Sequence, residues 1–271
     1  MKNVPILSSR RLGLACVMAT LAAVLPLQAL SQVYPAKPVK VLVGFTAGGA
    51  VDLIARSVGQ VMQASLGQPI VVENKPGAGT NIAMKALIDA PPDGYTLMLT
   101  ANSIAANPAL YKPAPFDPEK DVAPVALVGR VPVVIAANAA SPYTSVAQLI
   151  QAAKGKPNTI AYGTPGNGAT PHMAMEFFTR AAGVDLQHIP YKGGSQAITD
   201  AIGGQIPLVA VNALEVLPHV KSGKLRVIAV LSPGRSSIYP DVPTIAESGF
   251  PGFEASVWYG FIAPAATPRP V

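Results

Sequence analysis

Four glycine-rich segments are the parts of this sequence best suited to binding chemistry. They read FTAGGA from Phe45, PGAGTN from Pro76, GTPGNGAT from Gly163 and YKGGS from Tyr191. Each lies between an expected strand and a helical pattern, so each is expected to join a strand to a helix N-terminus. Such a position offers free N–H donors and a partial positive charge, and glycine lets the backbone approach a ligand closely. With their threonine hydroxyls, these loops favour binding of a small anion.

The residue types absent from these loops favour a carboxylate over other anions. The first three carry no Lys or Arg, and no G-x-x-x-x-G-K-[ST] motif occurs, which argues against phosphate. Sugar sites need aromatic platforms, and Trp258 is the one tryptophan. We therefore expect a small carboxylate held by backbone amides and hydroxyls, with side-chain contacts from Asn102 and Asn212 as open possibilities.

Catalytic and metal-binding patterns are scarce. His172, His188 and His219 are far apart in sequence and are interpreted as structural, and no G-x-S-x-G elbow occurs. We interpret Asp52, in the first turn of a helix, as a partner of the helix dipole and the loop amides rather than as a catalytic acid. The sequence thus predicts a protein that is not an enzyme and holds no metal and no cofactor.

The elements that position these loops alternate along the chain, which predicts an α/β fold with mainly parallel sheets. Strands are expected at 39–43, 70–72, 95–100, 159–162, 187–190, 207–211, 225–231 and 257–263. Helices are expected at 51–65, 80–89, 145–153, 170–182 (Thr170 as N-cap) and 195–202, and a short helix from the capping box at Thr244. Residues 105–123 are predicted to be a long surface connection and 125–136 an extended crossing segment.

Two crossings, near Val131 and near Glu254, imply that one α/β unit is inserted into another. We expect lobe 1 to comprise 32–131 and 255–271 and lobe 2 to comprise 132–254, with a cleft between them. Ligands in open α/β sheets bind outside the carboxyl ends of the strands. All four glycine-rich loops are expected at those ends.

The N-terminus predicts export. Lys2, Arg10 and Arg11 precede an apolar run that Pro26 interrupts, and Ala29 and Ser31 then place small residues at the two positions that a signal peptidase reads. This pattern is typical of a secretory signal peptide over 1–31, cleaved near Ser31 into the periplasm, by the Sec or the twin-arginine route; an uncleaved membrane anchor is the alternative. Cleavage removes the only cysteine, Cys16, and three of the 20 basic residues, which leaves 17 against 14 acidic ones. The remaining charge of +3, without a basic tract, predicts no nucleic-acid partner.

Seven motifs in order give the chain a family resemblance over 34–264. They read GGAVD at 48–52, VVENKPGAG at 71–79, PDGYTL at 92–97, NPALY at 107–111, PYKG at 190–193, GKLR at 223–226 and PDVPT at 240–244. The sequence resembles the periplasmic substrate-binding proteins of tripartite tricarboxylate transporters, the Bug family. The resemblance implies a monomeric, two-lobed receptor that closes on one small organic carboxylate and delivers it to the membrane permease subunits.

The resemblance also implies a set of binding residues. Carried over to this sequence, they are Thr46, Ala47, Gly48, Gly79, Thr80, Asn81, Thr164, Thr170 and Asn212, with Ser103 added to the set. Two alternatives share this site: a sensor component for a membrane signalling kinase, and an exported enzyme that uses a glycine loop as an oxyanion hole.

Three departures from the family pattern affect the expected ligand and fold. Both prolines of the usual first loop are absent from 44–49, so Thr46 adds a hydroxyl there. Asn212 stands where many members have Asp, which removes an acceptor charge for an amino group and favours a non-amino carboxylate. The family normally continues into C-terminal helices, whereas this sequence ends at Val271, so we expect an apolar sheet face of lobe 1 to be exposed.

Overall fold

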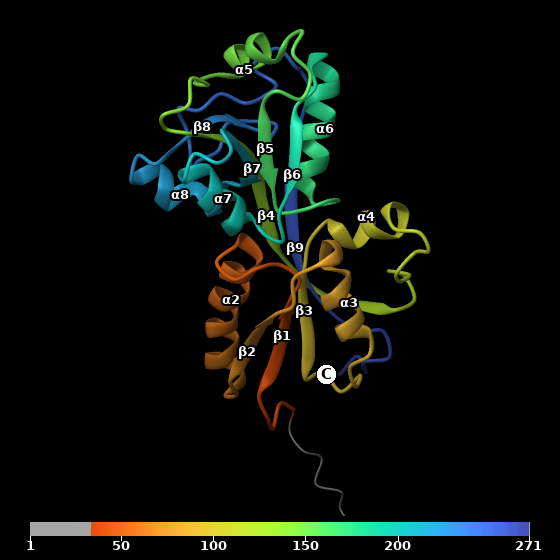
Figure 1. Ribbon diagram of the computed structural model, residues 1–271. Helices are drawn as coiled ribbons and strands as arrows, with labels where there is room; N and C mark the ends of the chain where they lie inside the picture. Colours follow the sequence, from red (N-terminus) through yellow and green to blue (C-terminus); the bar gives the residue numbers. More distant parts are fainter. Residues whose placement is uncertain (1–33, 271) are drawn as a thin grey trace, which may run out of the picture. The chain divides into compact units, whose positions relative to one another are not determined.

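The computed structural model describes residues 34–270, and its main compact unit runs from Lys37. The predicted signal peptide and Cys16 lie outside the described residues. No helix in the described part is both long and apolar enough to cross a membrane. Figure 1 shows two groups of strands and helices within the compact unit, joined by long strands.

The first group, called lobe 1 here, is built on three parallel strands. β1 (Val39–Val43) pairs in parallel with both β2 (Ile70–Asn74) and β3 (Thr96–Thr100). The helices of this lobe are α2 (Ala50–Leu66), the short 3-10 helix η1 (Ala78–Thr80), α3 (Asn81–Ile88) and α4 (Ser103–Leu110).

The second group, called lobe 2, repeats this plan. β5 (Ala161–Thr164) pairs in parallel with β6 (Gln187–Pro190) and β7 (Leu208–Asn212), while β8 (Leu225–Val230) pairs antiparallel with the long strand β4 (Val122–Asn138). Its helices are α5 (Val146–Ala153), α6 (Thr170–Ala182), α7 (Gly194–Ile202) and α8 (Ala213–Lys221).

One long strand, β4, runs through both groups. β4 (Val122–Asn138) pairs with β9 (Ser256–Pro264) from Val122 to Pro132 and then, from Val133 onward, with β7. The sheets are therefore mixed: parallel where the β-loop-α units lie, and antiparallel at β4, β8 and β9. This refines the mainly parallel arrangement expected from the alternating pattern.

Burial on both sheet faces explains the continuous apolar strands. In β1, Val41 and Val43 pack into the large cluster under α2, while Leu42 packs with Met84 and Met98 into a second cluster under α3. The part of β4 that lies in lobe 1 differs: Val125 and Leu127 are 55% and 66% exposed. An apolar sheet surface is thus open to solvent in lobe 1.

Several predicted elements were wrong in detail. The connection expected at 105–123 begins inside α4, whose apolar periodicity is weak because its buried face carries Ser103 and Asn107. Helix α8 was missed because Pro218 lies within it. Thr244 and Glu247 exchange the two capping-box hydrogen bonds (2.8 and 3.0 Å), yet only turns follow them. Gly249 and Gly252, both at positive φ, prevent the helix from continuing.

Candidate functional site

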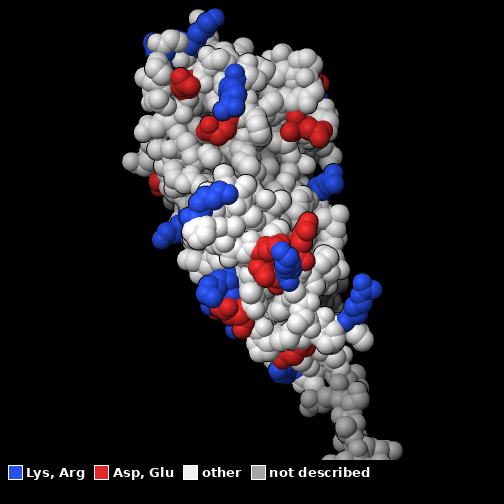
Figure 2. Space-filling model, turned by 90° about the vertical axis from the view of Figure 1, so that its right-hand side faces the viewer, with Lys and Arg blue, Asp and Glu red and all other residues white. Residues whose placement is uncertain are grey.

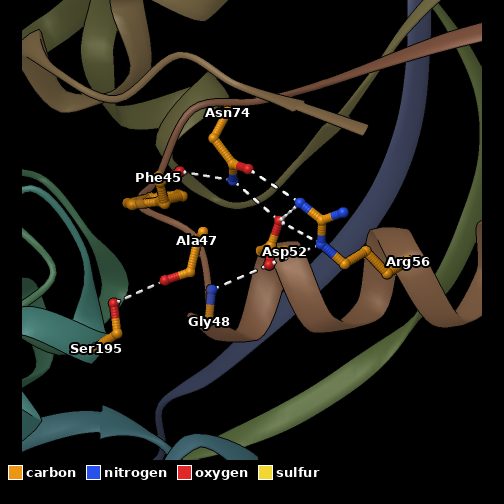
Figure 3. Close-up of polar contacts among 7 residues, drawn as sticks. All are labelled: Phe45, Ala47, Gly48, Asp52, Arg56, Asn74 and Ser195. Carbon is orange, nitrogen blue, oxygen red and sulfur yellow. Dashed lines mark hydrogen bonds and ion pairs between the residues drawn. The ribbon is translucent and has the colours of Figure 1, made fainter. Parts of the chain in front are cut away.

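The first glycine loop is held in place by a buried carboxylate (Figure 3). Asp52 in α2 accepts hydrogen bonds from the Gly48 N–H (3.0 Å), from Arg56 Nε (3.1 Å) and from Asn74 Nδ2 (3.0 Å). Burial raises the pKa of Asp52, but the hydrogen bonds from Arg56, Gly48 and Asn74 outweigh it, so the net pKa is lowered. Asp52 is thus a structural anchor of the loop, as interpreted from the sequence.

The second loop has a strained backbone conformation, which a neighbouring side chain supports. Ala78 and Thr80 adopt φ of 46° and 82°, a left-handed conformation that costs a non-glycine residue about 1–3 kcal/mol. The buried side chain of Asn107 supports the loop by donating to Gly79 O and Asn81 Oδ1, both at 2.7 Å. Strain of this kind concentrates at ligand clamps, where the surrounding structure holds the backbone in place.

The third loop rests on two stacked imidazole rings. His172 and His188 lie 4.1 Å apart between ring centroids. His188 Nε2 is 2.7 Å from Thr164 Oγ1, and His172 Nδ1 accepts the Gly168 N–H at 3.2 Å. Because Nδ1 accepts, the neutral ring of His172 carries its proton on Nε2, which faces Glu176 at 3.8 Å. His172 and His188 are structural, as predicted, although the sequence did not show that their rings stack.

The fourth loop meets the first. Ser195 Oγ donates to Ala47 O at 3.0 Å (Figure 3). It also lies 3.0 Å from Thr46 Oγ1, and because the Ser195 proton is already used, Thr46 is the donor in this second bond. A Cβ at Gly193 would collide with Thr46 Oγ1. Glycine is therefore required where α7 of lobe 2 approaches lobe 1.

Two cavities adjoin each other where the loops of the lobes meet, and Phe45 and Pro165 line both. The first, called the acceptor cavity, has a volume of about 30 Å³. Its polar side chains include Ser103, Thr170, Asn212, Glu215 and Tyr259. The second, called the loop cavity, has a volume of about 180 Å³. Its lining includes Gly77, Ala78, Gly79, Thr80, Tyr111, Asn167 and Lys192.

Glu215 is a buried carboxylate that the sequence analysis did not identify. It lies in the first turn of α8, is 5% exposed, and accepts from Asn212 Nδ2 at 2.9 Å. Burial raises its pKa more than the facing N–H groups of Ala50 and Asn212 lower it. Asn212 removes one acceptor charge relative to many family members, but the neighbouring Glu215 supplies another. An acidic residue three positions after a strand end is the sequence feature that could have shown it.

The predicted binding residues fall into three groups. Those that line a cavity are Ser103, Thr170 and Asn212 in the acceptor cavity and Gly79 and Thr80 in the loop cavity. Those at the contact between the lobes are Thr46 and Ala47. Those engaged within their own lobe are Gly48, bound to Asp52, Asn81, bound to Asn107, and Thr164, bound to His188.

Three further details bear on the predicted site. Thr170 is the first helical residue of α6 and Ala169 is its N-cap, so the predicted cap was one residue late. Asn102 binds the backbone of Ser256 and Trp258, which makes it structural. Within residues 34–270, no three His, Cys, Asp or Glu side chains gather as metal ligands.

Comparison with known proteins assigns the family. Residues 54–271 match the tripartite tricarboxylate transporter family receptor. The chain belongs to this family of receptors. Its relatives and structural neighbours are substrate-binding proteins rather than enzymes. The two-lobed fold of the periplasmic binding proteins, expected from the sequence, is confirmed by the same neighbours.

Three relatives illustrate the match. Protein BugT of Bordetella pertussis is 39% identical over 236 residues, which are 86% of this chain and 72% of BugT. The solved structure of the periplasmic binding protein BugD is 38% identical, with a TM-score of 0.84 over 88% of this chain and 79% of BugD. MatC from Rhodopseudomonas palustris, solved with bound malate, is 31% identical, with a TM-score of 0.83 over 88% of this chain and 81% of MatC.

Proposed function

We propose that this receptor captures a small organic carboxylate between its lobes in the periplasm and delivers it to the permease subunits of a tripartite transporter. One observation carries the proposal: glycine-rich loops of both lobes converge on two adjoining cavities. The strained backbone of Gly77–Thr80 and Lys192 of the other lobe line the same loop cavity. Backbone amides and a lysine are suitable partners for a carboxylate, and MatC holds malate in the same fold.

The acceptor cavity is too small for an organic acid in the conformation described. A volume of about 30 Å³ is close to that of one water molecule. A ligand that reaches this cavity therefore enters only when the lobes separate. The proposed boundaries, 32–131 with 255–271 against 132–254, place the hinge where β4 changes its partner from β9 to β7, next to the Pro132–Ser256 pair.

Binding is tested by thermal shift against mono-, di- and tricarboxylates, because a ligand specific for the folded state raises the Tm. The informative variant is Gly79→Ala: its Cβ would lie 2.6 Å from Tyr111 Oη, at a φ of 60°. Gly183→Ala is the matched control, with a φ of 63° and open space around it. Both variants lose about 1–2 kcal/mol of stability through the left-handed backbone.

Only Gly79→Ala is expected to lose most of the ligand-induced shift in Tm. If no carboxylate raises the Tm of the unmodified protein while a sugar or a metal ion does, the proposed ligand class is wrong. Equal loss of binding in both variants would contradict the placement of the ligand at Gly79.

Delivery and export need separate experiments. N-terminal sequencing of the periplasmic protein tests cleavage near Ser31. Crosslinking of the loaded receptor in membranes is expected to capture permease subunits; capture of a membrane kinase instead would favour the sensor alternative. A single-species mass in solution tests the proposed monomer.

A further inference from the structure

A third cavity, called the hinge cavity, lies against the segments that cross between the lobes. It has a volume of about 290 Å³ and is lined by 130–132 of β4, by 232–233 after β8, and by Glu254 and Ser256 at the start of β9. Backbone hydrogen bonds tie these three segments together, from Leu231 N–H to Val133 O (2.8 Å) and from Ala255 N–H to Leu231 O (2.6 Å). The cavity therefore adjoins the proposed hinge.

The hinge cavity and the acceptor cavity lie on opposite faces of the crossing strands. Successive side chains of a strand point to opposite faces. Val257 and Tyr259 line the acceptor cavity, whereas Ser256, between them and the hinge, lines the hinge cavity. Pro132 is paired with Ser256 and shares its face, and so does Arg130, two residues earlier in β4.

The hinge cavity carries one charge from each lobe. By the proposed boundaries Arg130 belongs to lobe 1 and Glu254 to lobe 2, with the Pro132–Ser256 pair between them. Within residues 34–270, neither charge takes part in an ion pair. Arg130 is opposite Trp258, and Glu254 lies four residues before Trp258, which corresponds to about 13 Å along an extended strand. The two charges are thus held apart in the conformation described.

Opening of the lobes is expected to shorten this distance. The bend lies where β4 changes its partner from β9 to β7, between Pro132 and Val133. Lobes that separate over the acceptor cavity bend the crossing strands away from that face and toward the opposite one. Arg130 and Glu254, on either side of the bend, then approach each other across the hinge cavity.

We propose that Arg130 and Glu254 form an ion pair when the lobes open, and that this pair sets the balance between the open and the closed receptor. In the closed form each charge is hydrated by itself, whereas the open form gains their attraction. An interaction made in only one of two states shifts the population toward that state. The inference rests on the lobes and hinge of the proposed function, and it concerns how tightly the receptor holds its ligand.

The separation of the lobes is measured by spin-label distances in the ligand-free receptor. Lys85→Cys in α3 and Arg180→Cys in α6 place one label on each lobe, at exposed positions outside the three cavities. The only natural cysteine, Cys16, lies in the predicted signal peptide. We expect a short and a long distance in the labelled receptor. Arg130→Gln is expected to lower the ratio of long to short about two- to fivefold, the effect of an exposed ion pair.

Further variants separate the pair from its individual charges. Glu254→Gln is expected to give the same loss, and the exchanged pair, Arg130→Glu with Glu254→Arg, is expected to restore the ratio. Lys154→Gln removes an exposed charge outside the three cavities and is the matched control, which leaves the ratio unchanged. Raised salt should lower the ratio with the pair intact but not in Arg130→Gln, because salt screens exposed charges.

Ligand affinity gives a second readout. The closed form holds the ligand, so a receptor that is less often open binds more tightly. Isothermal titration with malate, succinate and citrate is therefore expected to give a Kd that is lower in Arg130→Gln, by up to the same factor as the change in the distance ratio. Lys154→Gln is expected to keep the Kd of the unmodified receptor.

The outcomes distinguish the two proposals. A single distance in the ligand-free receptor overturns the hinge pair, as does an unchanged ratio in Arg130→Gln. An exchanged pair that folds with the Tm of the unmodified receptor but does not restore the ratio also overturns it. If none of the three acids binds while the distances respond as expected, the hinge pair holds and the proposed carboxylate ligand is wrong.

Discussion

Lobe 1 and lobe 2 hold their leading glycine loops by opposite chemistry. In lobe 1 an ionised carboxylate, Asp52, accepts the loop amide of Gly48 and is supported by Arg56. In lobe 2 an uncharged imidazole, His172, accepts the loop amide of Gly168 and stacks on His188. The folds are alike, but one loop needs a negative charge and the other needs a neutral ring. Acid therefore acts on the two loops in different pH ranges.

The largest expected effect comes from breaking the anchor of lobe 1. Asp52→Ala leaves the Gly48 amide and the Asn74 amide group without their acceptor and Arg56 without its partner. Loss of one member of a buried, hydrogen-bonded ion pair costs about 3–5 kcal/mol. Because Arg56 is half-exposed, we expect about 3 kcal/mol in chemical denaturation at pH 7.

Asp89→Ala is the control for this substitution. Asp89 pairs with Lys85 on the exposed side of α3, and such pairs contribute about 0.3–0.5 kcal/mol. If the two variants lose equal stability, Asp52 does not anchor the loop.

The lobe 2 anchor is expected to show its effect through pH. Burial lowers the pKa of His188 to about 4 and also lowers that of His172; the charge of Glu176 opposes both shifts. Below pH 6.5 the unfolded chain binds protons that the folded chain does not. Stability therefore falls as the pH decreases from about 6.5 to about 4.

This pH effect is expected to amount to about 2 kcal/mol, after allowance for the partial burial of the rings. His188→Gln, measured by denaturation at pH 7 and pH 4.5, should show a shallower dependence. Asp52 contributes in a different range: its pKa is lowered, so its stabilisation is complete above about pH 3.9 and is lost only below that. A slope between pH 6.5 and 4 that His188→Gln leaves unchanged would contradict the assignment.

The smallest expected effect concerns the contact that joins the two loops. Ser195→Ala removes the hydrogen bonds to Ala47 O and from Thr46, at a cost of about 1 kcal/mol in thermal unfolding. Ser222→Ala, which removes a bond within its own lobe to His219 O, is the control. In binding experiments only Ser195→Ala is expected to change the dissociation rate, because it alone joins the lobes. Equal dissociation rates would show that this contact does not hold the lobes together.

Much of the fold was predictable because its signals are local. The run VKVLV at 39–43 can be buried on both faces only in a covered sheet, and β1 has the predicted bounds. Helix α6 has the predicted bounds, 170–182, with Pro171 in its first turn and Gly183 after its end. Helices α4 and α8 were missed because Pro108 and Pro218 interrupt their local patterns. In α8, packing against β4, β7 and β8 offsets the lost hydrogen bond.

The loop residues were harder to assign than the loops themselves. Thr46, Thr164 and Thr170 are alike in sequence, yet one bridges the lobes, one binds His188 and one lines a cavity. The three uses depend on contacts with residues distant in the chain. Figure 2 shows a similar pattern at the surface, where acidic and basic side chains lie next to each other on the visible face. Their pairing could not be predicted from the sequence.

The sequence by itself determined the fold class, the positions of the glycine-rich loops and the family, because strand burial, helix starts and ordered motifs are properties of local sequence. Only the tertiary structure decided which polar atoms face a cavity. Asn212 and Glu215 lie at the start of α8 and Tyr259 lies in β9, and their unpaired oxygens come together only because both segments line the acceptor cavity. Whether a buried polar atom finds a hydrogen-bond partner depends on all the groups around it in space. The order of residues along the chain does not give those neighbours.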